Sequence, residues 1–288
     1  MALNSIPEVN MGLLNWITEP LAYGFFQRGL IAGLLVALSC GLLSTFVVWR
    51  GMSFIGDALS HAVLPGIVIA LLCGIPMQLG AFAFALLTVL LISALSHSAG
   101  FKEDTAIGVI FSGTFALGVL LLSKINTSRD LTHILFGSIL GISEADLIFI
   151  SAVSILVLVS VTLFYKELVL TSFDPAHAKA IGLSPALIQS GLLFLLALTT
   201  VSAIQTVGVV LILSLLITPG ATASLLSKRL SFIIALSLGI ASFAVWVGFY
   251  LSYYLDLPSG ASIVLILAIF FSLAFIKQRI GIIIKSKA

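Results

Sequence analysis

Hydrophobic residues along this chain come in long uninterrupted blocks, which short polar or turn-forming segments separate. A helix of about 20 residues crosses about 30 Å of hydrocarbon, whereas a membrane barrel shows short strands of alternating polarity. The pattern therefore predicts an all-α, polytopic transmembrane helical bundle. The expected spans lie near residues 29–49, 54–73, 78–97, 105–123, 145–165, 186–203, 206–226, 231–253 and 261–276.

The composition is that expected of an integral membrane protein. Hydrophobic residues make up 60% of it and charged residues 8%, with a mean hydropathy of +1.28, which is too little polar surface for a globule in water. The net charge of +2 is too small to indicate a nucleic-acid surface. Cys40 and Cys73 lie in apolar blocks without C-x-x-C spacing, so we expect two packed free thiols.

The number of spans depends on the sixth and seventh blocks, because only the segment SAIQT, residues 202–206, separates them. If they are two halves of one broken helix, the chain has eight spans. Nine spans place the N-terminus outside, the C-terminus inside and ten of the 13 basic residues in the cytoplasm, so charge favours nine. The basic residues expected inside are Arg50, Lys102, Lys166, Lys179, Lys228, Arg229, Lys277, Arg279, Lys285 and Lys287.

The chain is expected to form one domain, because it has no internal repeat and no low-complexity linker. Residues 11–25 are typical of an interfacial helix, with Trp16, Tyr23 and Phe25 suited to the headgroup layer. Five glycines in the spans are expected to let helices pack closely, namely Gly29, Gly33, Gly108, Gly113 and Gly118. The predicted segments are an N-terminal interfacial segment at 1–28, a transmembrane domain at 29–276 and a cytoplasmic basic tail at 277–288.

An acidic residue and a histidine interrupt the second span, in the stretch GMSFIGDALSHAVLPG. Asp57 and His61 are spaced i to i+4, so they share one helix face, with Ser53 one turn earlier on that face. At about 1.5 Å per residue from Arg50, His61 lies roughly 16 Å deep, near the membrane midplane. The two side chains either satisfy each other and hold helices in register, or face a pathway for a cation.

A carboxylate oxygen and a neutral imidazole nitrogen suit Zn²⁺ or Mn²⁺, and the absence of Cys or Met on that face argues against Cu(I). Two ligands are too few for a closed structural site. Other spans must contribute, or a symmetric dimer supplies a second Asp–His pair across its two-fold axis.

A second feature is TSFDPAHAKAIGLSP, residues 171–185. Asp174 can cap a helix that Pro175 begins, and Gly182 fits the left-handed position just past its end. The predicted helix is about two turns long, too short to span a membrane. It is either a surface connector or a docking helix for a partner, and His177 is expected to face solvent.

A third feature joins Gln205 and Thr206 to the Thr218-Pro219-Gly220 sequence. Pro219 removes one backbone hydrogen bond, so neighbouring helices, hydroxyls or water must satisfy the freed groups. Either a kink lines a pathway here, or the helices simply pack closely. The candidate pathway or gating residues are Ser53, Gln205, Thr218 and Pro219. The chain has no P-loop, H-E-x-x-H or G-x-S-x-G motif, which excludes a P-loop ATPase and weakens an intramembrane hydrolase.

These residues give the chain a resemblance to the metal-ion permease family of ATP-binding-cassette importers, whose members carry zinc, manganese or iron. The first matching segment, GMSFIGDALSHAVLPG, is highly specific. The others follow in family order through residue 230 and are FKEDTAIGVIFSGTFALGVLLLS, FGSILGIS, SFDPAHAKAIGLSP and AIQTVGVVLILSLLITPGATASLLSKRL.

The resemblance implies a homodimer or a pair of related permeases, a cytoplasmic ATPase on each permease, and an extracytoplasmic protein that delivers the metal. It implies that Asp57 and His61 match metal-pathway residues, and that 174–183 match the helix that docks into the ATPase. That helix comprises Asp174, Pro175, Ala176, His177, Ala178, Lys179, Ala180, Ile181 and Gly182.

The predicted function is that of a multi-pass permease in a bacterial inner or plasma membrane, which imports manganese, zinc or iron. One Asp and one His without a thiolate lean slightly toward manganese. No cofactor is expected to stay bound, and the partner ATPase uses the ATP, so the chain itself is not an enzyme. The alternative is a gradient-driven metal transporter or channel. An intramembrane metalloenzyme would need a third protein ligand and a general base.

Overall fold

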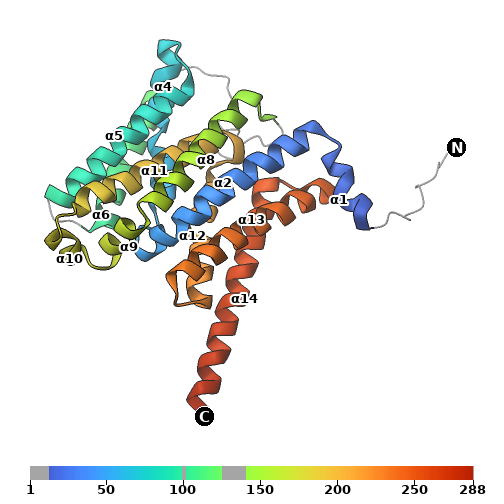
Figure 1. Ribbon diagram of the computed structural model, residues 1–288. Helices are drawn as coiled ribbons and strands as arrows, with labels where there is room; N and C mark the ends of the chain where they lie inside the picture. The colour runs from blue at the N-terminus through green and yellow to red at the C-terminus, as the bar shows by residue number, and fades with distance from the viewer. Residues whose placement is uncertain (1–12, 99–101, 125–140, 288) are drawn as a thin grey trace.

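The computed structural model describes residues 13–98, 102–124 and 141–287, and this part of the chain is helical without strands (Figure 1). The all-α prediction is therefore confirmed for the described residues. The helices are α1 (Leu13–Leu21), α2 (Gly24–Trp49), α3 (Ile55–Ala62), α4 (Leu64–Cys73), α5 (Met77–Ser98), α6 (Glu103–Leu122), α8 (Glu144–Leu163), α9 (Tyr165–Phe173), α10 (Pro175–Ala180), α11 (Pro185–Val207), α12 (Val209–Leu226), α13 (Leu230–Leu255) and α14 (Ser259–Lys287).

Nine segments of the described chain are long and apolar enough to cross a membrane, which confirms nine predicted spans over eight. The second span, Ile55–Cys73, is made of two short helices, α3 and α4. The first span, α2, begins at Gly24, inside the segment predicted to be interfacial. The last helix, α14, continues through the segment predicted as a basic tail, and its end projects from the bundle in Figure 1.

The sixth and seventh spans separate at Gly208, not within residues 202–206 as the polar side chains indicated. Helix α11 continues through that segment to Val207, and α12 begins at Val209. Gly208 has φ 82° and ψ 160°, a conformation that favours glycine because a side chain would clash. Backbone freedom, not side-chain polarity, ends the helix here.

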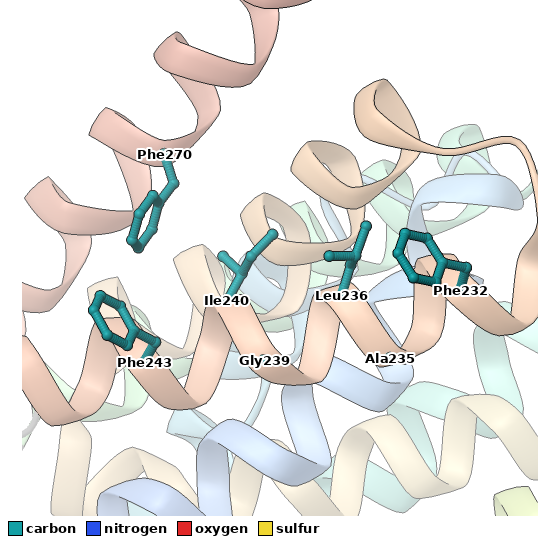
Figure 2. A pocket seen from close by; sticks show the side chains of 7 residues that line it. All are labelled: Phe232, Ala235, Leu236, Gly239, Ile240, Phe243 and Phe270. Atoms are coloured by element: carbon teal, nitrogen blue, oxygen red, sulfur yellow. The ribbon is translucent and has the colours of Figure 1, made fainter.

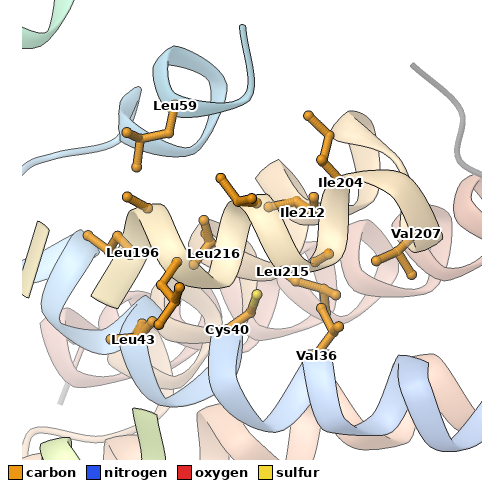
Figure 3. Packing of buried hydrophobic residues seen from close by; sticks show 14 of the residues in the cluster. Val36, Cys40, Leu43, Leu59, Leu196, Ile204, Val207, Ile212, Leu215 and Leu216 are labelled. Atoms are coloured by element: carbon orange, nitrogen blue, oxygen red, sulfur yellow. The ribbon is translucent and has the colours of Figure 1, made fainter. Parts of the chain in front are cut away.

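Helix α2 lies at the centre of the bundle, where serine hydroxyls connect it to its neighbours. Ser154 of α8 donates to the Leu35 carbonyl at 3.1 Å, and Ser237 of α13 donates to the Gly41 carbonyl at 2.6 Å. Figure 3 shows apolar side chains of α2, such as Cys40, facing side chains of α11 and α12. Hydrogen bonds and close packing hold helices together where lipid removes most of the hydrophobic drive.

Glycines sit where these helices approach most closely, as expected, but not everywhere. A Cβ on Gly33 would lie 3.1 Å from Val245 of α13, and one on Gly118 would lie 3.0 Å from Leu64. By contrast, a Cβ on Gly108 or Gly113 would meet no atom within 4 Å. These two glycines therefore leave part of α6 without a packed neighbour among the described residues.

Candidate metal-ligand site and coupling segment

The pair predicted from spacing lies together on α3. Asp57 Oδ1 is 3.4 Å from His61 Nε2, and the side chains keep 34% and 25% of their exposure. The helix is short because a turn precedes Ile55 and the helix ends at Val63. The two groups are thus paired but still accessible, so a ligand could reach both of them.

Ser53 does not lie on the helical face with Asp57, because α3 begins only at Ile55. It lies exposed in the turn that joins α2 to α3. Gly51, at φ 70°, ends α2, and the Met52 N–H donates back to the Val47 carbonyl at 3.0 Å. This left-handed glycine ends α2 and separates Ser53 from the helix that carries Asp57, so the predicted shared face does not form.

The second span breaks at Val63, two residues after His61. Pro65, the second residue of α4, has no N–H to donate to the His61 carbonyl, which would be its partner in a continuous helix. The Val63 N–H reaches that carbonyl instead, and α4 starts one residue later. The proline therefore places His61 at the end of a short helix rather than in the middle of a long one.

Two aromatic rings of α6 cover the imidazole. The His61 ring centroid is 5.1 Å from that of Phe115 in an edge-to-face arrangement, and 5.9 Å from that of Phe111. The two phenylalanine rings are themselves stacked at 5.8 Å. Sequence reasoning missed both residues because they read as ordinary members of an apolar block. Their packing fixes which face of α6 borders the Asp57–His61 pair.

The described residues contain no group of three or more His, Cys, Asp or Glu side chains placed to hold a metal ion. The side chains of His97 and His133 lie outside the described part of the chain. Asp57 and His61 therefore form a two-ligand half site within the described residues. A metal held there needs oxygen ligands from water or ligands from another chain.

A groove between α13 and α14 offers no such ligands. Figure 2 shows that its lining is made of hydrocarbon side chains and glycine. A surface without nitrogen or oxygen side-chain atoms cannot coordinate a cation, and suits lipid tails better. The lining residues are Phe232, Ala235, Leu236, Gly239, Ile240, Phe243 and Phe270.

The short helix predicted near 174–183 is α10, and both of its ends form as the sequence indicates. The Asp174 carboxylate accepts from the His177 N–H at 2.9 Å, and Pro175 begins the helix. Gly182 has φ 88°, and the Leu183 N–H donates to the Ala178 carbonyl at 3.0 Å. This is the Schellman pattern that a left-handed glycine permits.

Most of α10 faces outward, including His177, as predicted. Ala178 is fully buried and is its anchor on the rest of the protein. Apolar side chains flank the helix on the surface, because Phe173 is 58% exposed and Ile181 is 57% exposed. A slim helix with exposed apolar neighbours offers a contact surface for another protein.

The Pro219 region keeps its helix, since α12 runs through it without interruption. Ser44 of α2 accepts from the Gly220 N–H at 2.8 Å and donates to the Ile217 carbonyl at 3.2 Å. This hydroxyl thus bonds the backbone of α12 on both sides of Pro219. Pro219 is buried and Thr218 half-buried, so the geometry favours close helix packing. The Gln205 side chain lies outside the described part.

With this geometry established, comparison with known proteins shows where the chain belongs. The model of the ABC 3 transport family matches residues 22–278. This chain belongs to the ABC 3 transport family. Like the family it is a transport permease, and the nine apolar spans among its described residues make it a multi-pass membrane protein.

Relatives of this ABC 3 chain are similar over nearly their whole length. A probable iron transport system membrane protein of Haemophilus influenzae is 43% identical over 94% of this chain and 100% of its own. The manganese transport system membrane protein MntC of Listeria innocua is 43% identical over 88% of this chain and 91% of its own. The structure of PsaBC from Streptococcus pneumoniae in complex with Fab contains a chain with a TM-score of 0.80 and 38% identity, covering 92% of this chain and 95% of that one.

Proposed function

We propose that this permease is the membrane subunit of an ATP-driven importer for a divalent transition metal, and that Asp57 and His61 bind the metal in transit. The observation that carries the proposal is the accessible pair itself, 3.4 Å apart on a helix of an apolar span. Ionisable groups inside membrane spans are costly and usually line a pathway.

Manganese is the favoured metal. Carboxylate oxygen and imidazole nitrogen without thiolate suit Mn²⁺, although Zn²⁺ and Fe²⁺ accept the same atoms. The relatives add a preference, because several are named as manganese transport proteins and others as iron transport proteins. Selectivity between these ions then depends on the completed site and on the protein that delivers the metal.

We infer that a second copy of the chain completes the site. Asp57 and His61 are only half of a plausible coordination shell, and on α6 beside them no described residue packs against Gly108 or Gly113. Small residues of this kind let a second helix approach closely in lipid. A two-fold axis near α6 would bring two Asp–His pairs to one pathway.

The other partners follow from the importer mechanism. An extracytoplasmic protein releases the metal into the pathway, and a cytoplasmic ATPase docks on α10. The capped geometry of α10 and the exposed Phe173 and Ile181 beside it support this docking role. ATP-driven closure of the ATPases then opens the inner side, while the permease itself catalyses no reaction.

The site assignment is tested with Asp57→Ala, in proteoliposomes that contain the permease and the ATPase that copurifies with it. We expect Mn²⁺ uptake to fall to background while the complex still assembles, because the ion loses its carboxylate ligands. Asp256→Asn is the matched control, since Asp256 is exposed at the end of α13 and far in sequence from the pair. Normal uptake by Asp57→Ala would remove Asp57 from the pathway.

The energy source separates this proposal from a gradient-driven transporter. Uptake should require ATP on the side of the vesicle membrane that carries the ATPase, and it should persist when ionophores collapse the ion gradients. Uptake that stops with the ionophore and continues without ATP would favour the gradient-driven alternative.

The docking role of α10 is tested by charge reversal. Lys179→Glu places a carboxylate on the exposed face of α10, so we expect the ATPase to be lost on copurification. Lys228→Glu is the control, because Lys228 is exposed in the connection between α12 and α13. Equal recovery of ATPase with both variants would contradict the docking assignment.

A further inference from the structure

Arg50 lies where the ends of α2, α6 and α9 meet. This junction has no role in the function proposed above. Its side chain is only 7% exposed. Its Nε donates to Ser172 Oγ at 3.1 Å and its Nη2 donates to Thr171 Oγ1 at 3.1 Å, both on α9. Its Nη1 lies 3.9 Å from Glu103 Oε1 at the start of α6. Three guanidinium nitrogens thus reach two helices that are far apart in sequence.

Burying the charged guanidinium costs free energy, which a purely structural contact between apolar side chains would avoid. Burial lowers the pKa of the Arg50 guanidinium, and the nearby Glu103 carboxylate raises it in opposition. Arginine nonetheless stays charged in proteins, so the charge must be held by these partners. Buried ion pairs contribute little net stability, and their best-attested use is to fix one arrangement among alternatives.

On one side, Arg50 is tied to the end of α2, and only residues 51–54 separate it from α3, the helix that carries the metal ligands. It is the cap residue of α2, and its own N–H donates to the Phe46 carbonyl at 3.0 Å. Gly51 and Met52 close the helix end with two more backbone hydrogen bonds. Met52 is fully buried, and α3 begins only three residues later. A displacement of Arg50 therefore displaces α3.

On the other side, Arg50 holds the base of α10. Asp174 is the only residue between α9 and α10, and its N–H donates to the Leu170 carbonyl at 2.8 Å. The Phe173 ring also packs edge-to-face on Trp49 at 4.5 Å. Because the connection is a single hydrogen-bonded residue, α10 cannot tilt freely without moving the end of α9.

The third contact reaches the cover of the metal site. Glu103 is the first residue of α6, and the same helix carries Phe111 and Phe115 against His61. A rigid helix carries a displacement at its first turn along to those rings. The guanidinium therefore connects the base of α10 to α3, which carries Asp57 and His61, and to α6, which covers His61.

We propose that Arg50 is a positioning residue that transmits movement of α10 to α3 and α6, and so couples ATP hydrolysis to release of the metal. The inference rests on the proposed function, because it assumes that an ATPase acts on α10. Lysine carries the same charge as arginine but cannot reach three partners with fixed geometry. Arg50→Lys should therefore preserve the charge and lose the transmission.

The experiment measures Mn²⁺ ions imported per ATP hydrolysed by the full permease–ATPase complex in proteoliposomes. We expect Arg50→Lys to lower this ratio about tenfold, which corresponds to about 1.4 kcal/mol of coupling, with ATPase copurification unchanged. Arg28→Lys is the control, because Arg28 also pairs with a glutamate, Glu144 at 3.5 Å, but is exposed. If uptake and hydrolysis fall together at a constant ratio, Arg50 is only structural.

A second variant guards against misfolding of the first. Thr171→Val keeps the shape of a buried side chain and removes one hydroxyl that accepts from Arg50. We expect a smaller loss of the same ratio, about threefold, with a normal melting temperature. A normal ratio in Thr171→Val and Arg50→Lys together would overturn the proposal.

A fluorophore on α6 makes the result independent of the ion that is carried. Leu120 is 65% exposed, so Leu120→Cys in a Cys73→Ser background accepts a label. The label should respond to ATP with Arg50 present and not with Arg50→Lys. An ATP response that depends on Arg50 without Mn²⁺ import would refute the proposed substrate and keep this inference. An equal response in both proteins, or none in either, would overturn the inference.

Discussion

Two Pro-Gly pairs occur within the apolar spans of this permease, Pro65–Gly66 in the second span and Pro219–Gly220 in the seventh. The second span separates into α3 and α4 at Val63, just before the first pair. The seventh span stays one helix, α12, through the second pair. The same two residue types therefore accompany a helix break in the second span and lie inside a continuous helix in the seventh.

The difference comes from the neighbouring helix. At Gly220 the Ser44 hydroxyl of α2 takes the N–H and returns its own hydrogen to the Ile217 carbonyl. Near Pro65 the hydrogen bond comes from the same span, because the Val63 N–H donates to the His61 carbonyl. The helix continues where a hydroxyl of a neighbouring helix bonds the backbone on both sides of the proline, as Ser44 does, and it breaks near Pro65, where the backbone bond is made within the span itself. The break that results lies beside the proposed metal ligands.

The two glycines share a role that the prolines do not. A Cβ on Gly66 would overlap the Gly80 carbonyl oxygen of α5, and one on Gly220 would lie 2.6 Å from the Ser44 carbonyl oxygen. In both cases the obstacle is backbone, which cannot move aside cheaply. Each pair therefore marks a close helix crossing, whichever way its proline is accommodated.

The largest expected effect comes from filling these crossings. Gly66→Val and Gly220→Val should each abolish folded protein, because overpacking against backbone costs on the order of 3 kcal/mol or more. Size-exclusion chromatography in mild detergent, with the amount of monodisperse permease as readout, measures the loss. If one variant folded normally, the shared role of the two glycines would be wrong for that crossing.

Gly191→Ala is the matched control for that experiment. Gly191 lies within α11, and a Cβ there would meet no atom within 4 Å. The substitution should leave folding intact or raise stability by up to about 1 kcal/mol, because alanine is the better helix former. A loss of folded protein here would show that any glycine change harms this bundle.

Much of this fold follows from local sequence. The spans could be predicted because each is a continuous apolar block of the length that a bilayer demands. The ends of α10 could be predicted from Asp174, Pro175 and Gly182, because caps depend on a few adjacent residues. The Asp57–His61 pair followed from helical spacing alone.

What could not be predicted depends on contacts between distant segments. Arg50 and Thr171 are 121 residues apart, and nothing near either residue indicates that they meet. Phe115 looks like any apolar residue of its span until α6 is placed against α3. The continuity of α12 through Pro219 also depends on a neighbour, because Ser44 lies 176 residues from Gly220.

A smaller effect is expected from Ser44→Ala, which would make the Pro219 region resemble the Pro65 region. Removing the hydroxyl leaves the Gly220 N–H and the Ile217 carbonyl without it, at about 1–3 kcal/mol for an unsatisfied buried group. The melting temperature in detergent should fall by several degrees while uptake by the folded protein continues. Ser39→Ala on the same helix is the control, since Ser39 only donates to the Leu35 carbonyl of α2 itself, at 3.1 Å. Equal melting temperatures for the two variants would contradict the bridging role of Ser44.

The smallest effect is expected from Pro65→Ala, which removes the cause of the break beside the ligands. The alanine would restore an N–H that can donate to the His61 carbonyl, so α3 and α4 could join and turn His61 away from its present place. We expect folding to persist, while the Mn²⁺ concentration for half-maximal uptake rises about threefold, less than about 1 kcal/mol. Pro219→Ala is the control, because α12 is already continuous and Ser44 already satisfies its neighbours. It should leave the half-maximal concentration unchanged, and an equal shift in both variants would mean that the break does not position His61.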